Sequence, residues 1–491
     1  ESFALADFNK FSTASLITRS TNDIQQIQMT SILLLRLALM APIMAIGGLQ
    51  KAIHNAPNLS WIIALAVSVL LVVIAVLFVI AVPRFKKLQT LVDKLNLVTR
   101  ENLVGLKVIR AFHNEKIEQK KFQQANTELN KMGLFLNRLM MLLDPIMTLV
   151  MNFSSVAIVW FGAHLISSGN LQIGNMMAFL EYAMQVIISF LLLSMVFIMV
   201  PRAAVSVKRV GEVLDTLPSI VDPQSPQQLP DDATGKIEFK DVTFTYPDAD
   251  LPVLSSINFT AEPGQTTAFI GSTGSGKSTL INLIPRFYDV SAGQVLLDGV
   301  DIRQLKLEEL YDQIGYVPQK GVLFSGTIAS NIKYGNAKAS QKLVEKSAKI
   351  AQAAEFVSEL KNGYKNEIAQ GGSNVSGGQR QRLSIARAIA VEPNVYIFDD
   401  SFSALDFKTD AKLRLALAKE TKHKTVLIVG QRINTIMNAD KIIVLDEGKI
   451  VGQGTHQELM KNCEVYQEIA ASQLSEDDLQ KMSATIAKGA A

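Results

Sequence analysis

The most restrictive feature of this sequence is a nearly unbroken apolar run, WIIALAVSVLLVVIAVLFVIAV, at residues 61–82. As a helix, a run of this length crosses a hydrocarbon core of roughly 30 Å. The run therefore predicts a transmembrane helix. Hydrophobic residues make up 48% of the 491-residue chain, which is high enough to leave room for further spans and a second domain.

Three weaker apolar segments accompany this run, at about residues 31–50, 139–166 and 174–200. Each is long enough to be read as a membrane span. We therefore expect an all-α transmembrane domain with four spans over residues 1–206.

The ends of the spans differ in charge. Residues 84–138 hold 12 Lys and Arg, whereas residues 51–59 hold one and residues 167–172 hold none. Because basic loops stay in the cytoplasm, residues 1–30 and 84–138 are predicted to be cytoplasmic loops. The chain is thus expected to be a multi-pass protein of the cell membrane.

A change of composition separates the spans from the rest of the chain. Residues 207–235 are predicted to be a linker, since they include the Pro- and Asp-rich stretch LPSIVDPQSPQQLPDDATG. Strand-like segments such as QTTAFIGS and KTVLIVG then alternate with helical patterns, which predicts an α/β domain over residues 236–474. A polar tail follows at residues 475–491.

The segment GSTGSGKST, at residues 271–279, matches the pattern G-x-x-x-x-G-K-[S/T] between a strand-like and a helix-like segment. Its glycines let backbone N–H groups turn toward phosphate oxygens, and a helix N-terminus adds partial positive charge. By itself the pattern is typical of kinases, GTPases and motors alike. The predicted phosphate-binding residues are Gly271, Ser272, Thr273, Gly274, Ser275, Gly276, Lys277, Ser278 and Thr279.

Four further motifs distinguish between these classes of nucleotide-binding protein. Tyr246 in FTYPD matches an aromatic residue that stacks on adenine, and Gln319 in GYVPQ matches a glutamine loop. VSGGQRQRLSIARA and SALD match a signature helix and a loop that crosses a dimer interface. On these motifs the chain resembles the ATP-binding cassette (ABC) family, specifically exporter-type half-transporters with a fused membrane domain. The resemblance implies ATP with Mg²⁺, and it places the signature residues Ser376, Gly377, Gly378 and Gln379 and the D-loop residues Ser403, Ala404, Leu405 and Asp406 toward a partner's ATP site.

The membrane half is similar to the same exporters. FSTASLITRSTNDIQQIQ resembles their first intracellular loop, and ENLVGLKVIRAFHNEKIEQKKF resembles their second. Six spans are usual in the family, so the resemblance implies that this chain holds the third to sixth and that the first two are missing. It also implies that Phe8–Ala14 and Ile109–Lys116 contact nucleotide-binding domains.

Two adjacent aspartates end the strand-like segment NVYIFDD. By resemblance Asp399 holds Mg²⁺ through water, together with Ser278 and Gln319. The next position carries a glutamate general base in hydrolysing members, whereas this chain has Asp400, which is one methylene shorter. Since a general base must lie within about 2.6–3.2 Å of its proton, directly or through one water, Asp400 is expected to be a weak base.

Gln431 stands where the family has a histidine that contacts the γ-phosphate. Gln cannot become cationic, so support for developing phosphoryl charge is reduced. Beside an intact SGGQ, the two departures predict a heterodimer subunit with a weakly hydrolysing ATP site of its own, whose signature completes the partner's active site. The alternatives are a homodimeric exporter with slow hydrolysis and an ATP-binding regulatory or structural subunit.

Bulk charge and cysteine content exclude other classes. A formal net charge of +3 gives no reason to expect a nucleic-acid partner. The single cysteine excludes an internal disulfide and a cysteine-based zinc site. The expected partners are a second ABC half-transporter, membrane lipid and a small amphipathic substrate whose identity the sequence does not specify.

Overall fold

The structure is a computed structural model that describes residues 3–473. The chain forms two compact units: one is Thr13–Thr216, and the other joins the residues before Thr13 to the chain from Leu217 onward. The boundaries differ from the domain limits expected from the sequence, because the first residues pack with the α/β unit and the helical unit extends beyond residue 206. The expected tail at residues 475–491 lies outside the described residues.

The unit Thr13–Thr216 is entirely helical. Its elements are α2 (Thr13–Thr18), a π-helical turn (Arg19–Asp23), α3 (Ile24–Asn55), a 3₁₀ turn (Pro57–Leu59), α4 (Ser60–Val104), α5 (Leu106–Ala111), α6 (Glu115–Met141), α7 (Leu143–Ser167) and α8 (Ile173–Leu214). Within the described residues, four helical stretches are long and apolar enough to cross a membrane: Thr13–Asn55, Pro57–Val104, Glu115–Ser167 and Ile173–Phe190. These agree with the four spans expected from the sequence.

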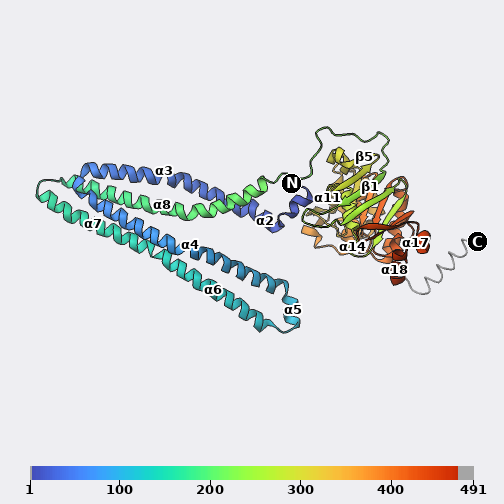
Figure 1. Cartoon of the computed structure of the whole chain (residues 1–491), viewed down its shortest axis with the longest axis horizontal. Coiled ribbons are helices and arrows are strands. Elements are labelled where there is room, and N and C mark those ends of the chain that lie inside the picture. Colours follow the sequence, from blue (N-terminus) through green and yellow to red (C-terminus); the bar gives the residue numbers. More distant parts are fainter. Residues whose placement is uncertain (1–2, 474–491) are drawn as a thin grey trace, which may run out of the picture. The chain divides into compact units, whose positions relative to one another are not determined.

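The helices continue well beyond a bilayer. Helix α4 has 45 residues, so it is about 68 Å long, more than twice the thickness of the hydrocarbon core. Helix α3 packs along α8, and α4 packs along α6 and α7 (Figure 1). Lys94 of α4 and Glu128 of α6 form an ion pair of 2.9 Å in the part beyond the apolar run. The basic segment 84–138 is therefore a long helical hairpin, with α5 at its tip (Figure 1).

Charged and polar side chains join the segment just before α3 to the C-terminal part of α8. Asp23, the last residue of the π-helical turn, accepts a hydrogen bond of 2.8 Å from Ser206 Oγ and lies 3.8 Å from Arg209. Arg19 donates to Glu212 at 3.0 Å. Because Asp23 is only 7% exposed, these contacts fix the register of the two helices more firmly than a solvated ion pair would.

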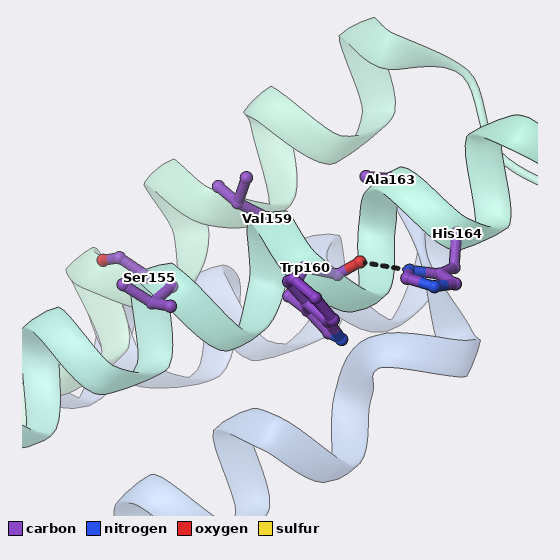
Figure 2. A pocket seen from close by; sticks show the side chains of 6 residues that line it. Ser155, Val159, Trp160, Ala163 and His164 are labelled. Atoms are coloured by element: carbon purple, nitrogen blue, oxygen red, sulfur yellow. Dashed lines mark hydrogen bonds between the residues drawn. The ribbon is translucent and has the colours of Figure 1, made fainter.

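Aromatic side chains lie close together at the start of α4 and near the end of α7. Trp61 packs edge-on against Phe161, with 5.3 Å between the ring centroids. Trp160 and His164 line an open, apolar cavity of about 470 Å³ on α7 (Figure 2). Tryptophan favours the headgroup level of a bilayer, so this end of the spans is suited to a membrane–water interface.

The second unit is an α/β fold with three sheets. The strands run in the order β12-β11-β3-β10-β9-β6 in the largest sheet, which is parallel except for β12, and β2-β1-β4-β5 in an antiparallel sheet; β7 pairs with β8. The strands are β1 (Ile237–Phe244), β2 (Leu254–Ala261), β3 (Thr266–Gly271), β4 (Ala292–Leu297), β5 (Val300–Asp301), β6 (Ile314–Val317), β7 (Gly326–Thr327), β8 (Glu367–Ile368), β9 (Val395–Asp399), β10 (Thr425–Val429), β11 (Lys441–Asp446) and β12 (Lys449–Gly454). The helices are α1 (Leu5–Asn9), α9 (Lys277–Leu283), α10 (Leu307–Asp312), α11 (Ile328–Ile332), α12 (Gln341–Ile350), α13 (Ala354–Glu359), α14 (Gly377–Ala390), α15 (Phe407–Glu420), α16 (Ile433–Ile436), α17 (His456–Asn462) and α18 (Glu464–Gln473). The α/β P-loop fold expected from the sequence is confirmed.

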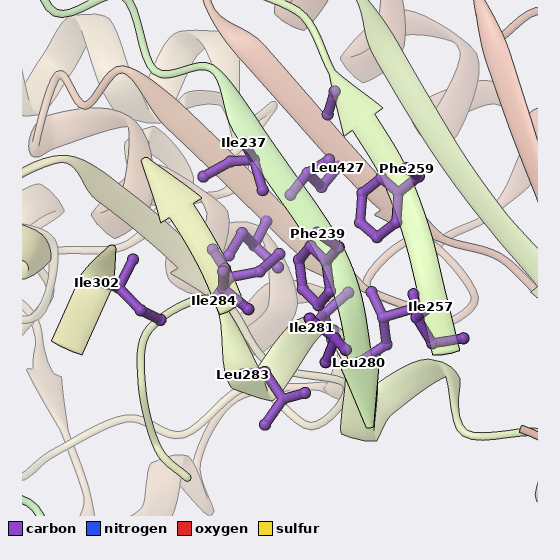
Figure 3. Close-up of a cluster of buried hydrophobic side chains, with 14 of the residues drawn as sticks. Ile237, Phe239, Ile257, Phe259, Leu280, Ile281, Leu283, Ile284, Ile302 and Leu427 are labelled. Carbon is purple, nitrogen blue, oxygen red and sulfur yellow. The ribbon is translucent and has the colours of Figure 1, made fainter. Parts of the chain in front are cut away.

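The largest apolar core of this unit lies around helix α9. Leu280, Ile281 and Leu283 of α9 are fully buried among side chains of β1, β2 and the parallel strands (Figure 3). Phe239 and Phe259 stack within this core at 4.5 Å between ring centroids. Every residue of β9 and β10 is buried, as expected for central parallel strands covered on both faces. Helix α9 is thus held rigidly at the edge where these strands end.

The N-terminal helix α1 packs on the α/β unit. The Asp7 carboxylate is buried and accepts hydrogen bonds from Ser219, of 2.7 Å from the backbone N and 3.0 Å from Oγ. Burial raises the pKa of Asp7, but the hydrogen bonds from Ser219 and Lys10 outweigh it and hold the pKa below its ordinary value. Asn9 Nδ2 donates to Tyr288 Oη at 3.4 Å. This helix overlaps the contact segment Phe8–Ala14 expected from the sequence.

Replacing Asp7 by Ala should release α1 from the α/β unit, because the two hydrogen bonds from Ser219 to the buried carboxylate would be lost, at about 1 kcal/mol for each bond. We expect faster amide hydrogen exchange in α1 of the intact protein and unchanged exchange in β3. Lys10→Ala is the matched control, since its side chain is 53% exposed and it contacts the same carboxylate at 3.2 Å. Equal protection of α1 in Asp7→Ala and wild type would contradict this anchoring role.

Candidate functional site

The loop between β3 and α9 has the backbone conformation that a phosphate-binding loop requires. Gly276 precedes α9 with φ +97°, and an added Cβ there would lie 2.7 Å from Leu254 Cδ2. At Gly271 an added Cβ would lie 2.0 Å from the carbonyl oxygen of Leu445. Only glycine fits these two positions, so the glycines of the predicted motif are required by the fold itself.

Lys277, the first residue of α9, folds back over this loop. Its Nζ donates to the carbonyl oxygens of Gly271 at 2.9 Å and Ser272 at 2.7 Å, and to Ser275 Oγ at 3.2 Å. Burial lowers the pKa of Lys277, and the charges of Asp400 and Asp399 at the end of β9 partly offset this effect. The ammonium group therefore lies at the centre of the loop, where phosphate oxygens can replace the carbonyl oxygens as its acceptors.

The next residue along α9 meets the end of β9. Ser278 Oγ donates to Asp399 Oδ1 at 3.2 Å, and Asp399 is only 6% exposed. Burial raises the pKa of Asp399, partly offset by the bond from Ser278. Hydroxyl and carboxylate oxygens are the hard ligands that Mg²⁺ prefers, so this pair fits a magnesium ion that also binds substrate phosphates. When bound, such an ion neutralises phosphate charge. In the described part of the chain, no group of three or more His, Cys, Asp or Glu side chains could hold a metal ion.

Asp400 lies beside this pair in an unusual backbone conformation. Its φ is +44°, a region that non-glycine residues seldom adopt. Its Oδ2 accepts a hydrogen bond of 3.4 Å from Gln319 Nε2, and its carbonyl oxygen accepts one of 2.9 Å from Ser403 Oγ. Burial raises the pKa of Asp400, while the bond from Gln319 and the charges of Arg432 and Lys277 oppose that rise. The predicted metal-site and base residues are therefore brought together at one strand end.

Gln431 lies on the exposed loop after β10. Its carbonyl oxygen accepts a hydrogen bond of 2.8 Å from Gln473 Nε2, and Gln473 Oε1 accepts one of 2.9 Å from the backbone N of Ile433. One side chain of α18 thus bridges the loop on both sides of Arg432. The charge of Arg432 acts to lower the pKa of Asp400, so the loop faces the same strand end.

Tyr246 lies near the start of α9 after strand β1. Its hydroxyl forms a hydrogen bond of 2.9 Å with Thr279 Oγ1. Its ring packs edge-on against Phe244, at 4.8 Å between centroids, and against Tyr288, at 5.3 Å. These contacts fix a half-buried aromatic ring close to the phosphate loop, where a base attached to the bound phosphates can stack on it.

The signature segment begins helix α14. Ser376 Oγ accepts a hydrogen bond of 3.2 Å from the backbone N of Gln379, and Gln379 Oε1 accepts one of 2.9 Å from the backbone N of Ser376. This reciprocal pair is a capping box. No atom lies within 4 Å of a Cβ placed on Gly377, so the helix N-terminus is open to an anion.

The D-loop packs beside this helix end. A Cβ on Gly378 would lie 3.3 Å from the carbonyl oxygen of Ala404, and Leu405 packs against a buried core. Asp406 caps α15 by accepting a hydrogen bond of 3.0 Å from the backbone N of Thr409. Backbone hydrogen bonds, first of all that from Thr409, lower the pKa of Asp406. The signature and D-loop residues therefore form one surface.

The structure adds residues that sequence reasoning missed. Gln381 is 2% exposed, and its amide bridges Pro318 and Gly321, which flank Gln319. It lies at helical spacing with the buried Ser384 and Ala388, on the apolar face of α14. A polar residue on that face was a visible sign of a buried hydrogen bond. Gln473 and Tyr288 carried no comparable local sign.

The phosphate loop, the hydroxyl–carboxylate pair, the aromatic ring and the helix N-terminus together define a nucleotide-binding domain. The same chain carries four helical stretches suited to a membrane. This combination defines the class of membrane proteins that bind ATP and transport solutes.

Comparisons with known proteins identify the family. The ABC transporter transmembrane region matches residues 4–190, and the ABC transporter model matches residues 254–403. An uncharacterized ABC transporter ATP-binding protein of Mycobacterium tuberculosis is 44% identical over 478 residues, which cover 96% of this chain and 81% of that protein. An ATP-dependent lipid A-core flippase of Hahella chejuensis is 33% identical over 476 residues, covering 96% of this chain and 80% of that protein. The solved structure of a bacterial Atm1-family ABC exporter with ATP bound matches with a TM-score of 0.81 and 26% identity, over 97% of this chain and 83% of that chain. The chain belongs to the ABC transporter family.

The resemblance drawn from the motifs is thereby confirmed. The chain is an exporter-type half-transporter, embedded in the membrane, with a cytoplasmic ATP-binding domain. Its ATPase activity is coupled to transport, and exporters of this fold work as dimers.

Replacing Tyr246 by Leu should weaken ATP binding by about tenfold or more, because stacking of a base on an aromatic ring contributes roughly 1–3 kcal/mol. Tyr246→Phe keeps the ring and loses only the bond to Thr279, so a threefold loss or less is expected by the scale of a single hydrogen bond. Titration with a fluorescent ATP analogue measures both. Tyr334→Leu is the matched control, since this tyrosine is 62% exposed and stacks on Phe324 instead. Equal affinities of Tyr246→Leu and Tyr334→Leu would contradict the assignment.

Proposed function

We propose that this chain is one subunit of a heterodimeric exporter with two unequal ATP sites. Its own phosphate loop binds ATP and hydrolyses it slowly, while its SGGQ segment completes a competent site on the partner. The observation that carries this proposal is the pair of departures at one site, Asp400 and Gln431, beside an intact signature and D-loop.

Asp400 is poorly suited to act as a general base. An aspartate carboxylate is one methylene nearer its own backbone than a glutamate carboxylate, and proton transfer depends on a reach of about 3 Å. The side chain is also engaged by Gln319 at 3.4 Å. These features support residual hydrolysis at a reduced rate.

Gln431 provides weaker support for phosphoryl transfer than a histidine would. A neutral amide can donate a hydrogen bond to a phosphate oxygen but adds no positive charge as negative charge develops. The loop itself is well supported, since Gln473 bridges its backbone. The proposed loss of support for phosphoryl transfer therefore comes from the Gln431 side chain and not from a displaced loop.

The surface offered to the partner retains its anion-binding features. Ser376 and Gln379 form a complete capping box at an open helix N-terminus, and Ser403 and Asp406 anchor the D-loop. A purely structural subunit has no need of such a surface. This contrast favours a transporting heterodimer over a regulatory subunit.

The transported compound is proposed to be amphipathic or apolar, with a lipid-like molecule favoured. The relative from Hahella chejuensis is named a lipid A-core flippase and aligns with 96% of this chain. The exposed side chains on α3, α4 and α7 are predominantly apolar, which suits a substrate that enters from the membrane.

Asp400→Ala is expected to change the ATP turnover of the co-purified heterodimer by less than about twofold, because hydrolysis is concentrated at the partner's site. Mutation of the partner's base to Ala should abolish turnover. Steady-state phosphate release from the complete complex measures both. Equal, large losses from the two variants would exclude unequal sites, and robust hydrolysis by this chain alone would exclude the heterodimer.

The double substitution Asp400→Glu with Gln431→His should make this chain's own site competent. We expect ATP turnover to persist when the partner's base is removed, at about tenfold or more above the same complex with Asp400 and Gln431, since general bases contribute at least this much. The single substitution Asp400→Glu is the control for the longer reach of the carboxylate alone, without the histidine. Turnover that stays at background in the double variant would show that some other feature limits this site.

A further inference from the structure

We propose that Gln381 is a positioning residue that couples the two ATP half-sites of this chain. One half-site is the phosphate loop with Gln319, which holds the chain's own ATP; the other is the SGGQ segment, which serves the partner's ATP. The proposal rests on the roles given to these segments under the proposed function. It adds a physical connection between them.

The Gln381 amide holds the Gln319 loop from both sides. Its Nε2 donates to the carbonyl oxygen of Pro318 at 3.1 Å, and its Oε1 accepts from the backbone N of Gly321 at 3.0 Å. The side chain is 2% exposed, so water does not compete for these bonds. A single side chain thus fixes the backbone before and after Gln319.

The loop has no free space where it lies against α14. A Cβ added to Gly321 would lie 2.7 Å from Ser384 Oγ and 3.1 Å from both the Arg380 carbonyl oxygen and Gln381 Oε1. Arg387, further along α14, donates to the carbonyl oxygen of Val322 at 2.9 Å. The loop therefore cannot shift without α14 shifting or these bonds breaking.

Helix α14 carries that displacement to the signature. Gln381 is five residues after Ser376, in one uninterrupted helix of 14 residues. A helix of this length moves as a rigid body, so a shift at Gln381 reaches the N-terminal residues that bind the partner's phosphate. At the other end, Gln319 contacts Asp400 at 3.4 Å. The proposed connection itself runs from Gln319, which responds to ligand, through Gln381 to Ser376, and it does not require the Asp400 side chain.

Only an amide of this length satisfies both backbone groups. Glutamate can accept from Gly321 but cannot donate to Pro318, and leucine leaves both groups buried without a partner. Asparagine keeps both groups and withdraws them by one methylene. The residue type therefore predicts a graded response to substitution.

The proposed connection would give this chain's own, slowly hydrolysing ATP site a regulatory role. Ligand that repositions Gln319 alters the geometry of SGGQ, so occupancy of this chain's own site tunes hydrolysis at the partner's site. Such a link is a coupling free energy between two sites, and it acts in both directions for binding. A site kept for binding would then regulate the site kept for turnover.

A double-substitution cycle on the complete transporter in lipid nanodiscs tests this connection. The four proteins are wild type, Gln319→Ala, Gln381→Leu and the double variant, and the readout is steady-state turnover of Mg²⁺-ATP. We expect Gln381→Leu to lower turnover by about tenfold in the wild-type background, the order seen when buried hydrogen bonds lose a partner. In the Gln319→Ala background it should lower turnover by less than about twofold, because the connection is already broken.

Ser384→Ala is the matched control. Ser384 is 2% exposed on the same face of α14, and its Oγ donates at 3.0 Å to the Arg380 carbonyl oxygen of its own helix. Its effect should be below about twofold and should be the same with and without Gln319. Gln381→Asn is a second variant that keeps both polar groups, and it should show the same dependence on Gln319 with a smaller effect.

Three measurements separate coupling from simple loss of structure. The melting temperature and the affinity for a fluorescent ATP analogue should stay near wild type in Gln381→Asn while turnover falls. Additive effects of Gln319→Ala with both Gln381→Leu and Gln381→Asn would overturn the proposal, as would an equal, Gln319-dependent loss in Ser384→Ala. A large loss on Asp400→Ala would instead refute the unequal sites, and the cycle would still report coupling within one chain.

Discussion

The burial of α9 between two sheets is the constraint on which the ATP-binding domain depends. Leu280, Ile281, Leu283 and the following Ile284 are fully buried and fix this helix against β1, β2 and the parallel strands. Its N-terminus can then point only toward the loop from β3, and the left-handed conformation of Gly276 makes that sharp change of direction possible. The positions of Lys277 and Ser278 follow from this packing. Asp399 contacts Ser278 because β9 lies in the same sheet as β3, the strand that leads into the loop before α9.

Glutamine side chains extend this rigid centre to the surrounding loops. Gln381 bridges the backbone around Gln319, and Gln473 bridges the backbone around Gln431. An amide can do this because it donates and accepts at once, matching one carbonyl and one N–H group of an irregular loop. Each loop is therefore tied to a helix, α14 or α18, by hydrogen bonds from one side chain.

The sequence predicted features that depend on local backbone requirements. The phosphate loop, the signature and the ends of β9 and β10 each need particular residues within a few positions, so their patterns are readable without a structure. The four spans were equally readable, because a run of about 20 apolar residues matches the thickness of a bilayer core and is uncommon outside membrane helices. By contrast, Asp7 meets Ser219 across 212 positions and Gln381 meets Pro318 across 63. The partners in such contacts depend on how elements pack, so a single segment can at most show that a buried hydrogen bond exists, as at Gln381, and cannot show its partner. The resemblance implied a contact of Phe8–Ala14 with a nucleotide-binding domain, but not the hydrogen bonds of Asp7 that hold α1 to this chain's own α/β unit.

The end of β9 is compatible with the proposal of two unequal sites. Asp400 contributes its side chain to the chain's own site and its carbonyl oxygen to Ser403 of the D-loop. The bond from Ser403 goes to the backbone, so it does not depend on which side chain stands at position 400. The backbone there has φ +44° in any case, because Asp400 N also donates to Val429 O at 3.1 Å and fixes the turn. A substitution at this position therefore changes the base without moving the D-loop. The same holds for Gln431, whose backbone is bound by Gln473. Backbone hydrogen bonds therefore hold the turn at position 400 and the loop at position 431, so the proposed loss of function at these side chains does not require a change in either loop.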